Sequence, residues 1–276
     1  MLRRLPSVLP GFGITFGFTT FFLCAIVLLP LTALVMRAAS MDLGDFFRVV
    51  TDPRALASYR LTFGTALLAA TINLVFGFVI AWTLVRYRFP GRRFVDAIID
   101  MPFALPTAVS GIALTAVFAA NGIIGRHLEP LGIKVAYTPW GVVLALMFVG
   151  LPFIVRTLQP VIADLDRELE GAAETLGASR LQTFRWVVLP AIWPALLTGC
   201  ALAFSRSVGE YGSVIFIAGN LPNVSEIAPL LIVIRLSEFR YADATAIAVI
   251  MLLASFLIIL VVNRLQRWAQ ARIPMH

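Results

Sequence analysis

Two opposite charges, Arg206 and Glu210, lie four residues apart inside an apolar stretch of the chain. A charge near the centre of a membrane helix costs at least ~2.5 kcal/mol, so such residues usually face a cavity or a partner. The spacing also allows the two charges to neutralise each other on one helix face, which is the purely structural alternative. Serine hydroxyls nearby offer hydrogen bonds to an oxyanion, and glycines permit local unwinding. The candidate residues for lining an anion path are Ser205, Arg206, Ser207, Gly209, Glu210 and Ser213.

A second informative segment runs from Asp164 to Ser179. At 100° per residue, one narrow helical stripe collects its apolar side chains, while the acidic residues occupy other faces. The stripe contains Leu165, Leu169, Ala172, Ala173 and Leu176. Gly177 predicts a helix stop in left-handed backbone, and a second helix is expected over 180–189, ended by Pro190 and Pro194. This pattern fits a helix that docks into a partner's groove, or an amphipathic connector lying against a membrane.

The residue inventory excludes several kinds of enzyme. The single lysine, Lys134, does not belong to a phosphate-binding GxxxxGK[ST] loop, so ATP binding by that mechanism is excluded. The two histidines, His127 and His276, are far apart, and the sequence holds neither an HExxH helix nor a cysteine cluster. We therefore expect this chain to carry no catalytic residue, no cofactor and no metal. Because the basic residues are dispersed, we also expect no nucleic-acid partner.

Composition places these segments in a membrane protein. The chain has 276 residues, of which 60% are apolar and only 13% charged. A soluble domain carries roughly 45–50% apolar and about 25% charged residues. The net charge of +7 is the usual consequence of arginines that flank membrane spans.

Apolar runs of about 20 residues predict six membrane helices. The predicted spans are 14–36, 61–85, 102–120, 140–158, 195–217 and 244–262. In the third, Pro102 and Pro106 are expected in the first turns, where a missing donor is tolerated. Asn73 in the second is expected to form a hydrogen bond between helices. Prolines and Glu226 interrupt the apolar stretch 221–236, which leaves a seventh span open.

Arginines cluster beside the end of the second span, at Arg86, Arg88, Arg92 and Arg93. Since basic residues accumulate on the cytoplasmic side, both termini are expected to be cytoplasmic. The predicted organisation is an N-terminal segment 1–58 with the first span and a periplasmic loop, and a cytoplasmic tail 265–276; the division of the remainder as a five-helix core 59–264 is what the family resemblance described below implies. Within the core, the cytoplasmic loop 159–194 contains the amphipathic segment.

This loop resembles the EAA loop of permease subunits in ATP-binding-cassette (ABC) importers, whose pattern is EAA-x3-G-x9-I-x-LP. The matching residues are Ala172, Ala173, Gly177, Val187, Leu189 and Pro190. Gly171 stands where the family usually has glutamate, with Glu170 one position earlier, and Val187 replaces isoleucine. The resemblance implies an all-α, polytopic helix bundle of the type I, MetI-like permease architecture, and a coupling helix that seats in a separate ATPase subunit. The docking residues it implies are Leu169, Glu170, Ala172, Ala173, Leu176 and Gly177.

Further runs are similar to the T-type permease subunits of bacterial sulfate/thiosulfate importers: GEYGSVIFIAGN at 209–220, APLLI at 228–232 and FRYADA at 239–244. This similarity implies an inner-membrane subunit that forms half of an anion pathway with a W-type paralogue, served by two ATPase copies and a periplasmic binding protein. ATP would bind on the partner. A homodimer, a molybdate or tungstate permease, a secondary transporter using Glu210 as a proton relay with Arg206, and a scaffold without transport remain alternatives.

Overall fold

The computed structural model describes residues 11–271, and every regular element among them is helical. The elements are α1 Phe12–Leu23, η1 Cys24–Leu28, α2 Leu29–Ala39, α3 Leu43–Val50, α4 Pro53–Arg86, α5 Arg92–Ala104, α6 Thr107–Phe118, α7 Gly125–Leu128, η2 Glu129–Leu131, α8 Pro139–Ala163, α9 Arg167–Thr175, α10 Arg180–Thr183, η3 Phe184–Val188, α11 Leu189–Val208, α12 Val214–Ile217, α13 Ala228–Ser237 and α14 Tyr241–Ala271.

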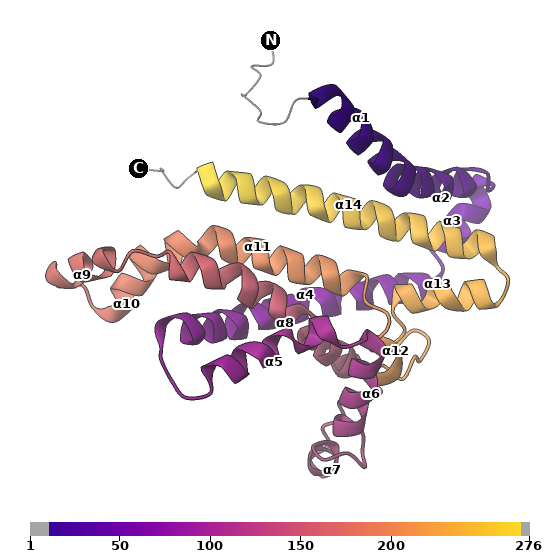
Figure 1. The fold of residues 1–276 in the computed structure, drawn as a ribbon. Coiled ribbons are helices and arrows are strands. Elements are labelled where there is room, and N and C mark those ends of the chain that lie inside the picture. Colours follow the sequence, from indigo (N-terminus) through magenta and orange to yellow (C-terminus); the bar gives the residue numbers. More distant parts are fainter. Residues whose placement is uncertain (1–10, 272–276) are drawn as a thin grey trace.

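Helices α4, α8 and α11 pack against one another as the centre of the bundle. Helix α14 lies along α11 and α13, and α5 lies against α8. One end of the bundle carries α9 and α10, and the opposite end carries α3, α12 and α13 (Figure 1). Fully buried side chains such as Leu84, Ile154 and Leu158 fill the contact between the central helices. We call the end with α9 and α10 the coupling end, and the other the distal end.

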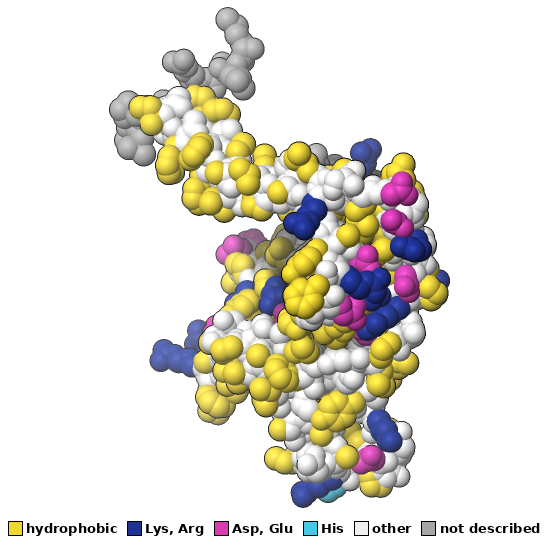
Figure 2. All heavy atoms as spheres, turned by 90° about the vertical axis from the view of Figure 1, so that its right-hand side faces the viewer, with side chains coloured by type: hydrophobic (Ala, Val, Ile, Leu, Met, Phe, Trp, Pro, Cys, Tyr) yellow, Lys and Arg dark blue, Asp and Glu magenta, His cyan; other side chains and the backbone are white. Residues whose placement is uncertain are grey.

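Five helical segments are long and apolar enough to cross a membrane, and the pair α5–α6 makes a sixth if it is counted as one bent span. The first segment, Phe12–Ala39, forms an arm whose apolar side chains are almost all exposed. Figure 2 shows these side chains covering the arm, while charged side chains gather at the distal end. Such a surface suits lipid contact, because hydrocarbon solvates apolar side chains as well as a protein core does.

The prediction of one continuous third helix over 102–120 is wrong. Helices α5 and α6 meet at Leu105–Pro106 and are bent by 115°. The residue before a proline is pushed out of the α region, and Leu105 is extended with φ −83° and ψ 137°. Pro102 therefore lies in the last turn of α5, and Pro106 is the N-cap of α6.

The predicted fifth span, 195–217, is wrong at both ends. The helix runs from Arg180 to Val208 as one apolar segment and does not stop at Pro190 or Pro194. A π-helical turn, η3, directly precedes Leu189–Pro190, and the Leu189 N–H donates to the Phe184 carbonyl five residues back. The wider turn accommodates a proline that lacks its own donor. The same device precedes Pro30, where the Leu29 N–H donates to the Cys24 carbonyl.

The stretch 221–236 is not a seventh span. Its helix α13 has ten residues, and at 1.5 Å per residue it covers about 15 Å, half of a ~30 Å hydrocarbon core. The second helix begins earlier than predicted, since Asp52 caps it and Pro53 occupies its first position. The boundary drawn at residue 58 therefore falls inside helix α4.

Candidate functional site

The coupling end is shaped by the cap structures of α9. The Asp166 carboxylate accepts a hydrogen bond from the Glu168 N–H and fixes the start of the helix. At its end Gly177 has φ +82°, the Gly177 N–H donates to the Glu174 carbonyl, and the Ala178 N–H donates to the Ala173 carbonyl. This is the Schellman arrangement, which requires left-handed backbone and favours glycine. The predicted helix stop at Gly177 is confirmed.

Apolar side chains of α9 and its cap project outward. Leu169 is 55% exposed and Leu176 is 87% exposed, and Ala172 is also exposed, while Ala173 is half-buried. Leucines this exposed on a helix that leaves the bundle indicate a surface awaiting a partner.

Glu170 differs from the other five predicted docking residues. Its carboxylate lies 2.5 Å from the Arg86 guanidinium at the end of α4, so it faces the chain's own core. The Arg86 guanidinium also lies 5.0 Å from the centre of the Trp82 ring. Because this pair joins two helices of one chain, the structure assigns Glu170 to holding α9 against α4. Glu170 precedes the family's glutamate position by one residue, which is a rotation of about 100° around the helix.

In the segment 205–213, Arg206 and Glu210 form an ion pair of 2.6 Å, as their spacing predicts. Helix α11 ends at Val208, so Glu210 lies in the turn beyond it. Its second oxygen accepts hydrogen bonds from the Ser213 N–H at 3.0 Å and the Ser213 hydroxyl at 2.9 Å. Local side-chain bonds of this kind compete with helical ones and explain why the helix stops.

Burial divides the six predicted path residues into two groups. Ser207, Glu210 and Ser213 are almost fully buried, whereas the Arg206 side chain is 36% exposed. Ser205 and Gly209 are exposed beside it. The buried Glu210 thus binds one nitrogen of the Arg206 guanidinium, and the other donors of that guanidinium stay accessible. Ser213 in turn holds Glu210, which makes both of them positioning residues for Arg206.

Two glycines allow α6 to press against this turn. A Cβ on Gly111 would lie 2.3 Å from the Ser213 carbonyl oxygen, and a Cβ on Gly212 would lie 2.1 Å from the Thr107 hydroxyl oxygen. Real carbon–oxygen contacts are far longer, so a side chain at Gly111 would displace the backbone of Ser213, and one at Gly212 would displace the Thr107 hydroxyl. The bent pair α5–α6 therefore abuts the turn that carries Glu210.

One predicted contact in the membrane interior is confirmed. The Asn73 side chain donates to the Met147 carbonyl at 2.9 Å and so links α4 to α8. Ser207 lies near it, since a Cβ on Gly150 would fall between the Asn73 amide and the Ser207 hydroxyl. That hydroxyl is buried and has no hydrogen-bond partner among the described residues.

Reasoning from sequence missed an arginine fork between α5 and α8. Arg156 binds Asp100 through two hydrogen bonds of 2.8 and 2.6 Å, and Asp96 at 2.7 Å. Gln159 donates to Asp96 as well. A charged residue within the apolar run 140–158, together with two acids four residues apart, was the available signal.

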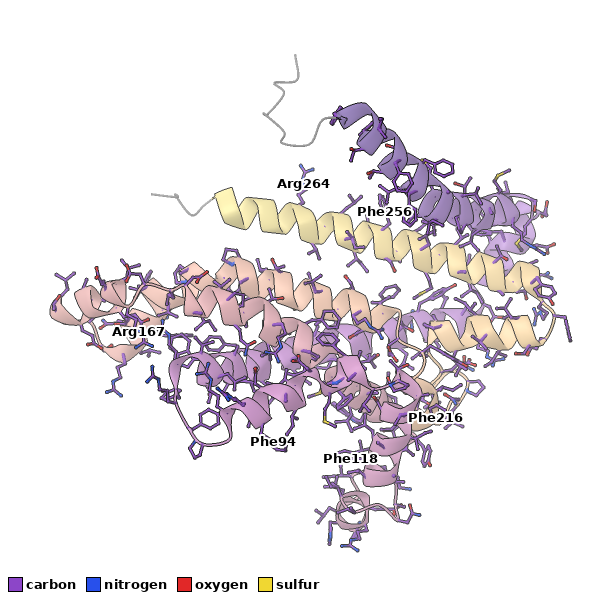
Figure 3. The ribbon with its side chains drawn as sticks, in the orientation of Figure 1. Phe94, Phe118, Arg167, Phe216, Phe256 and Arg264 are labelled. Atoms are coloured by element: carbon purple, nitrogen blue, oxygen red, sulfur yellow. The ribbon has the colours of Figure 1, made fainter. Side chains whose placement is uncertain are left out.

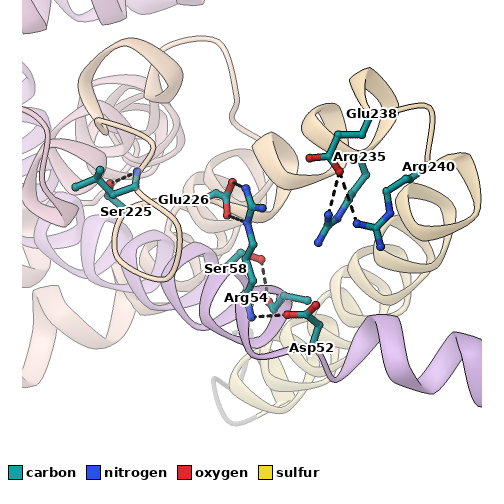
Figure 4. A network of polar contacts seen from close by, with 10 residues as sticks. Asp52, Arg54, Ser58, Ser225, Glu226, Arg235, Glu238 and Arg240 are labelled. Carbon is teal, nitrogen blue, oxygen red and sulfur yellow. Dashed lines mark hydrogen bonds and ion pairs between the residues drawn. The ribbon is translucent and has the colours of Figure 1, made fainter.

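A second missed pair closes the distal end. Figure 4 shows Arg54, at the start of α4, bound to Glu226, which precedes α13. The Arg54 guanidinium donates two hydrogen bonds of 2.7 Å to the Glu226 carboxylate. The Glu226 side chain is only 1% exposed. The two residues are 172 positions apart, so no local pattern could have paired them.

Together, the bundle of membrane-length helices and the projecting, capped helix α9 define a polytopic membrane domain with an exposed apolar helix at one end. Residues 73–274 match the family described as "Binding-protein-dependent transport system inner membrane component". The chain belongs to this family, whose members are multi-pass inner-membrane permeases and transport components of ABC importers rather than enzymes.

Curated relatives extend the match over almost the whole chain. The chain is 49% identical over 269 residues to the "Sulfate transport system permease protein CysT" of Salmonella typhimurium, covering 98% of this chain and 97% of the relative. It is 47% identical over 273 residues to the protein of the same name from Synechococcus elongatus, covering 98% of each.

Solved structures show the same fold. A chain of the bacterial alginate ABC transporter in complex with an alginate pentasaccharide-bound periplasmic protein has a TM-score of 0.74 at 16% identity, covering 92% of each chain. A chain of the MetNI methionine ABC transporter has a TM-score of 0.59 at 18% identity, covering 83% of this chain and 99% of that one. The predicted all-α type I importer architecture is confirmed.

Proposed function

We propose that this chain is the permease subunit that forms one half of a sulfate pathway in an ATP-driven importer. The observation that carries the substrate is the 49% identity to a sulfate permease over 98% of the chain. Sulfate fits better than molybdate, because the curated relatives reported above are named as sulfate permeases. Thiosulfate, a similar dianion, is included in the proposal.

Helix α9 is the proposed contact with the ATPase. Leu169, Ala172, Ala173 and Leu176 form an apolar patch, and Gly177 ends the helix at a point where a negative charge would face the partner. ATP binds and is hydrolysed on that partner, and the present chain contributes no cofactor-binding residue. We propose that the coupling end and both termini are cytoplasmic.

Arg206 is the proposed anion contact of the pathway, together with the exposed Ser205 and Gly209. Glu210 keeps the guanidinium oriented and lowers its net charge, so that an anion is attracted but not trapped. The rival proton relay through Glu210 is disfavoured, because three donors from Arg206 and Ser213 occupy both carboxylate oxygens. The other half of the pathway comes from a paralogous W-type permease, and a periplasmic sulfate-binding protein delivers the substrate.

Affinity capture of the tagged chain from cells that express the whole transporter tests the partner assignment. The ATPase, the paralogous permease and the tagged chain should co-purify, and the variant Leu176→Glu should lose the ATPase while keeping the paralogue. Capture of the tagged chain with the paralogue alone, in wild type as well, would contradict the proposal. Uptake of labelled molybdate that excess sulfate does not reduce would overturn sulfate as the substrate.

A further inference from the structure

An open cavity of about 460 Å³ lies at the coupling end, between α9 and the core. Three arginines from three different helices line it: Arg86 at the end of α4, Arg92 at the start of α5 and Arg167 at the start of α9. Gln159 of α8 adds an amide. In Figure 3, Arg167 lies at the end of the bundle that carries α9 and α10. The cavity is within the size range of sites that bind small ligands.

The positive charge of this cavity is only partly compensated. Arg86 pairs with Glu170 through one terminal nitrogen, and its Nε is buried with no hydrogen-bond partner among the described residues. The guanidinium groups of Arg92 and Arg167 form no hydrogen bond or ion pair within the described part of the chain. A phosphate-type anion matches such a set of donors, since guanidinium groups bind its oxygens in pairs.

Neighbouring acids are already occupied. Asp96, one turn after Arg92, receives hydrogen bonds from Arg156 and Gln159, and Asp100 is bound by Arg156. Asp166 caps α9 by accepting from the Glu168 N–H.

The backbone adds to the positive potential. Helix α5 starts after Gly91, which has φ +82° and offers no side-chain cap. The Arg92 and Phe94 N–H groups donate to the Phe89 and Gly91 carbonyls, so the helix start contributes the positive end of its dipole rather than a set of free amides.

We propose that this cavity binds a tetrahedral oxyanion of the phosphate type, either the headgroup of an anionic lipid or free phosphate or sulfate. Bound there, the anion bridges Arg167 of the coupling helix to Arg86 and Arg92 of the core. It thereby stiffens the connection through which α9 would act. That regulatory consequence rests on the proposed coupling role of α9, whereas the binding site itself does not.

The test uses the whole transporter in nanodiscs and compares two double variants. Arg92→Gln/Arg167→Gln removes two guanidiniums from the cavity, and the matched control Arg88→Gln/Arg93→Gln removes two neighbouring exposed arginines that do not line it. In phosphatidylcholine nanodiscs, binding of labelled inorganic phosphate is measured. In nanodiscs with added phosphatidylglycerol, lipid retained by the purified complex is measured by native mass spectrometry.

Wild type and control should bind alike, and the cavity variant should bind at least tenfold more weakly in one of the two arms. Loss in the phosphate arm identifies a free anion, and loss in the lipid arm identifies a headgroup. Equal binding by the cavity variant and the control in both arms overturns the site. Unchanged melting temperatures of both variants verify folding, and sulfate uptake, measured separately, reports on the proposed function.

Discussion

Substitution Gly111→Ala tests the packing of α6 against the turn that holds Glu210. The added methyl would lie 2.3 Å from the Ser213 carbonyl oxygen, whereas ordinary contact begins at 3.4 Å, so the backbone of one element must retreat by roughly 1 Å. Overpacking of this kind typically lowers the free energy of unfolding by ~1–3 kcal/mol. At ~2–4 °C per kcal/mol, the melting temperature should fall by roughly 2–12 °C. The shift also moves Ser213, and we expect sulfate uptake to fall at least fivefold.

The measurements are thermal unfolding of the purified transporter and initial rates of uptake. Gly64→Ala is the matched control, because it also adds a methyl to a helical glycine but meets nothing within 4 Å. In Gly212→Ala the obstructing atom is the Thr107 hydroxyl, so the added change Thr107→Ala should restore much of its stability but none of that of Gly111→Ala. The reasoning is refuted if Gly111→Ala and Gly64→Ala match in stability and uptake.

Three other substitutions probe separate parts of the molecule. Gly177→Asp should leave membrane insertion intact, as judged by immunoblot, and should abolish sulfate uptake. Gly177→Asn should retain uptake, because asparagine also tolerates the left-handed backbone at this position. Equal loss of uptake in both variants would refute a charge effect at the docking surface. Glu226→Gln should destabilise the transporter by about 3 kcal/mol in thermal unfolding, because Arg54 loses a buried partner and its side chain is only 26% exposed; an unchanged melting temperature would contradict this. Arg156→Gln should speed hydrogen exchange over residues 92–104, because α5 loses the fork that ties it to α8, and unchanged exchange there would count against that role.

Local pattern was enough to predict most helices and the coupling segment. The apolar stripe that includes Leu169 and Leu176 predicts which face of the helix is apolar, and Gly177 predicts where the helix ends. Both signals come from residues close together in the sequence, so no tertiary contact is needed to recognise them. Hydropathy alone could not place the break at Leu105–Pro106, because the residues directly before and after it are mostly apolar. The extended preference of a residue before proline was the missing consideration.

Long-range pairing could not be read from the chain. The ion pair of Arg206 and Glu210 was predictable, because four residues separate its members. Arg54 and Glu226 meet only when α4 packs beside α13, and Glu170 finds Arg86 only when α9 folds back toward α4. Whether Glu170 contacts a partner or its own chain depends on the direction of its side chain, and this direction is set by the tertiary structure.

The most direct test of the central claim is uptake of labelled sulfate into proteoliposomes that contain this chain, its paralogous permease and the ATPase, with the binding protein outside and ATP trapped inside. The account predicts concentrative uptake that requires trapped ATP and ceases with Gly177→Asp. Sulfate uptake of the same rate by this chain alone, without ATP and driven by a proton gradient, would contradict it.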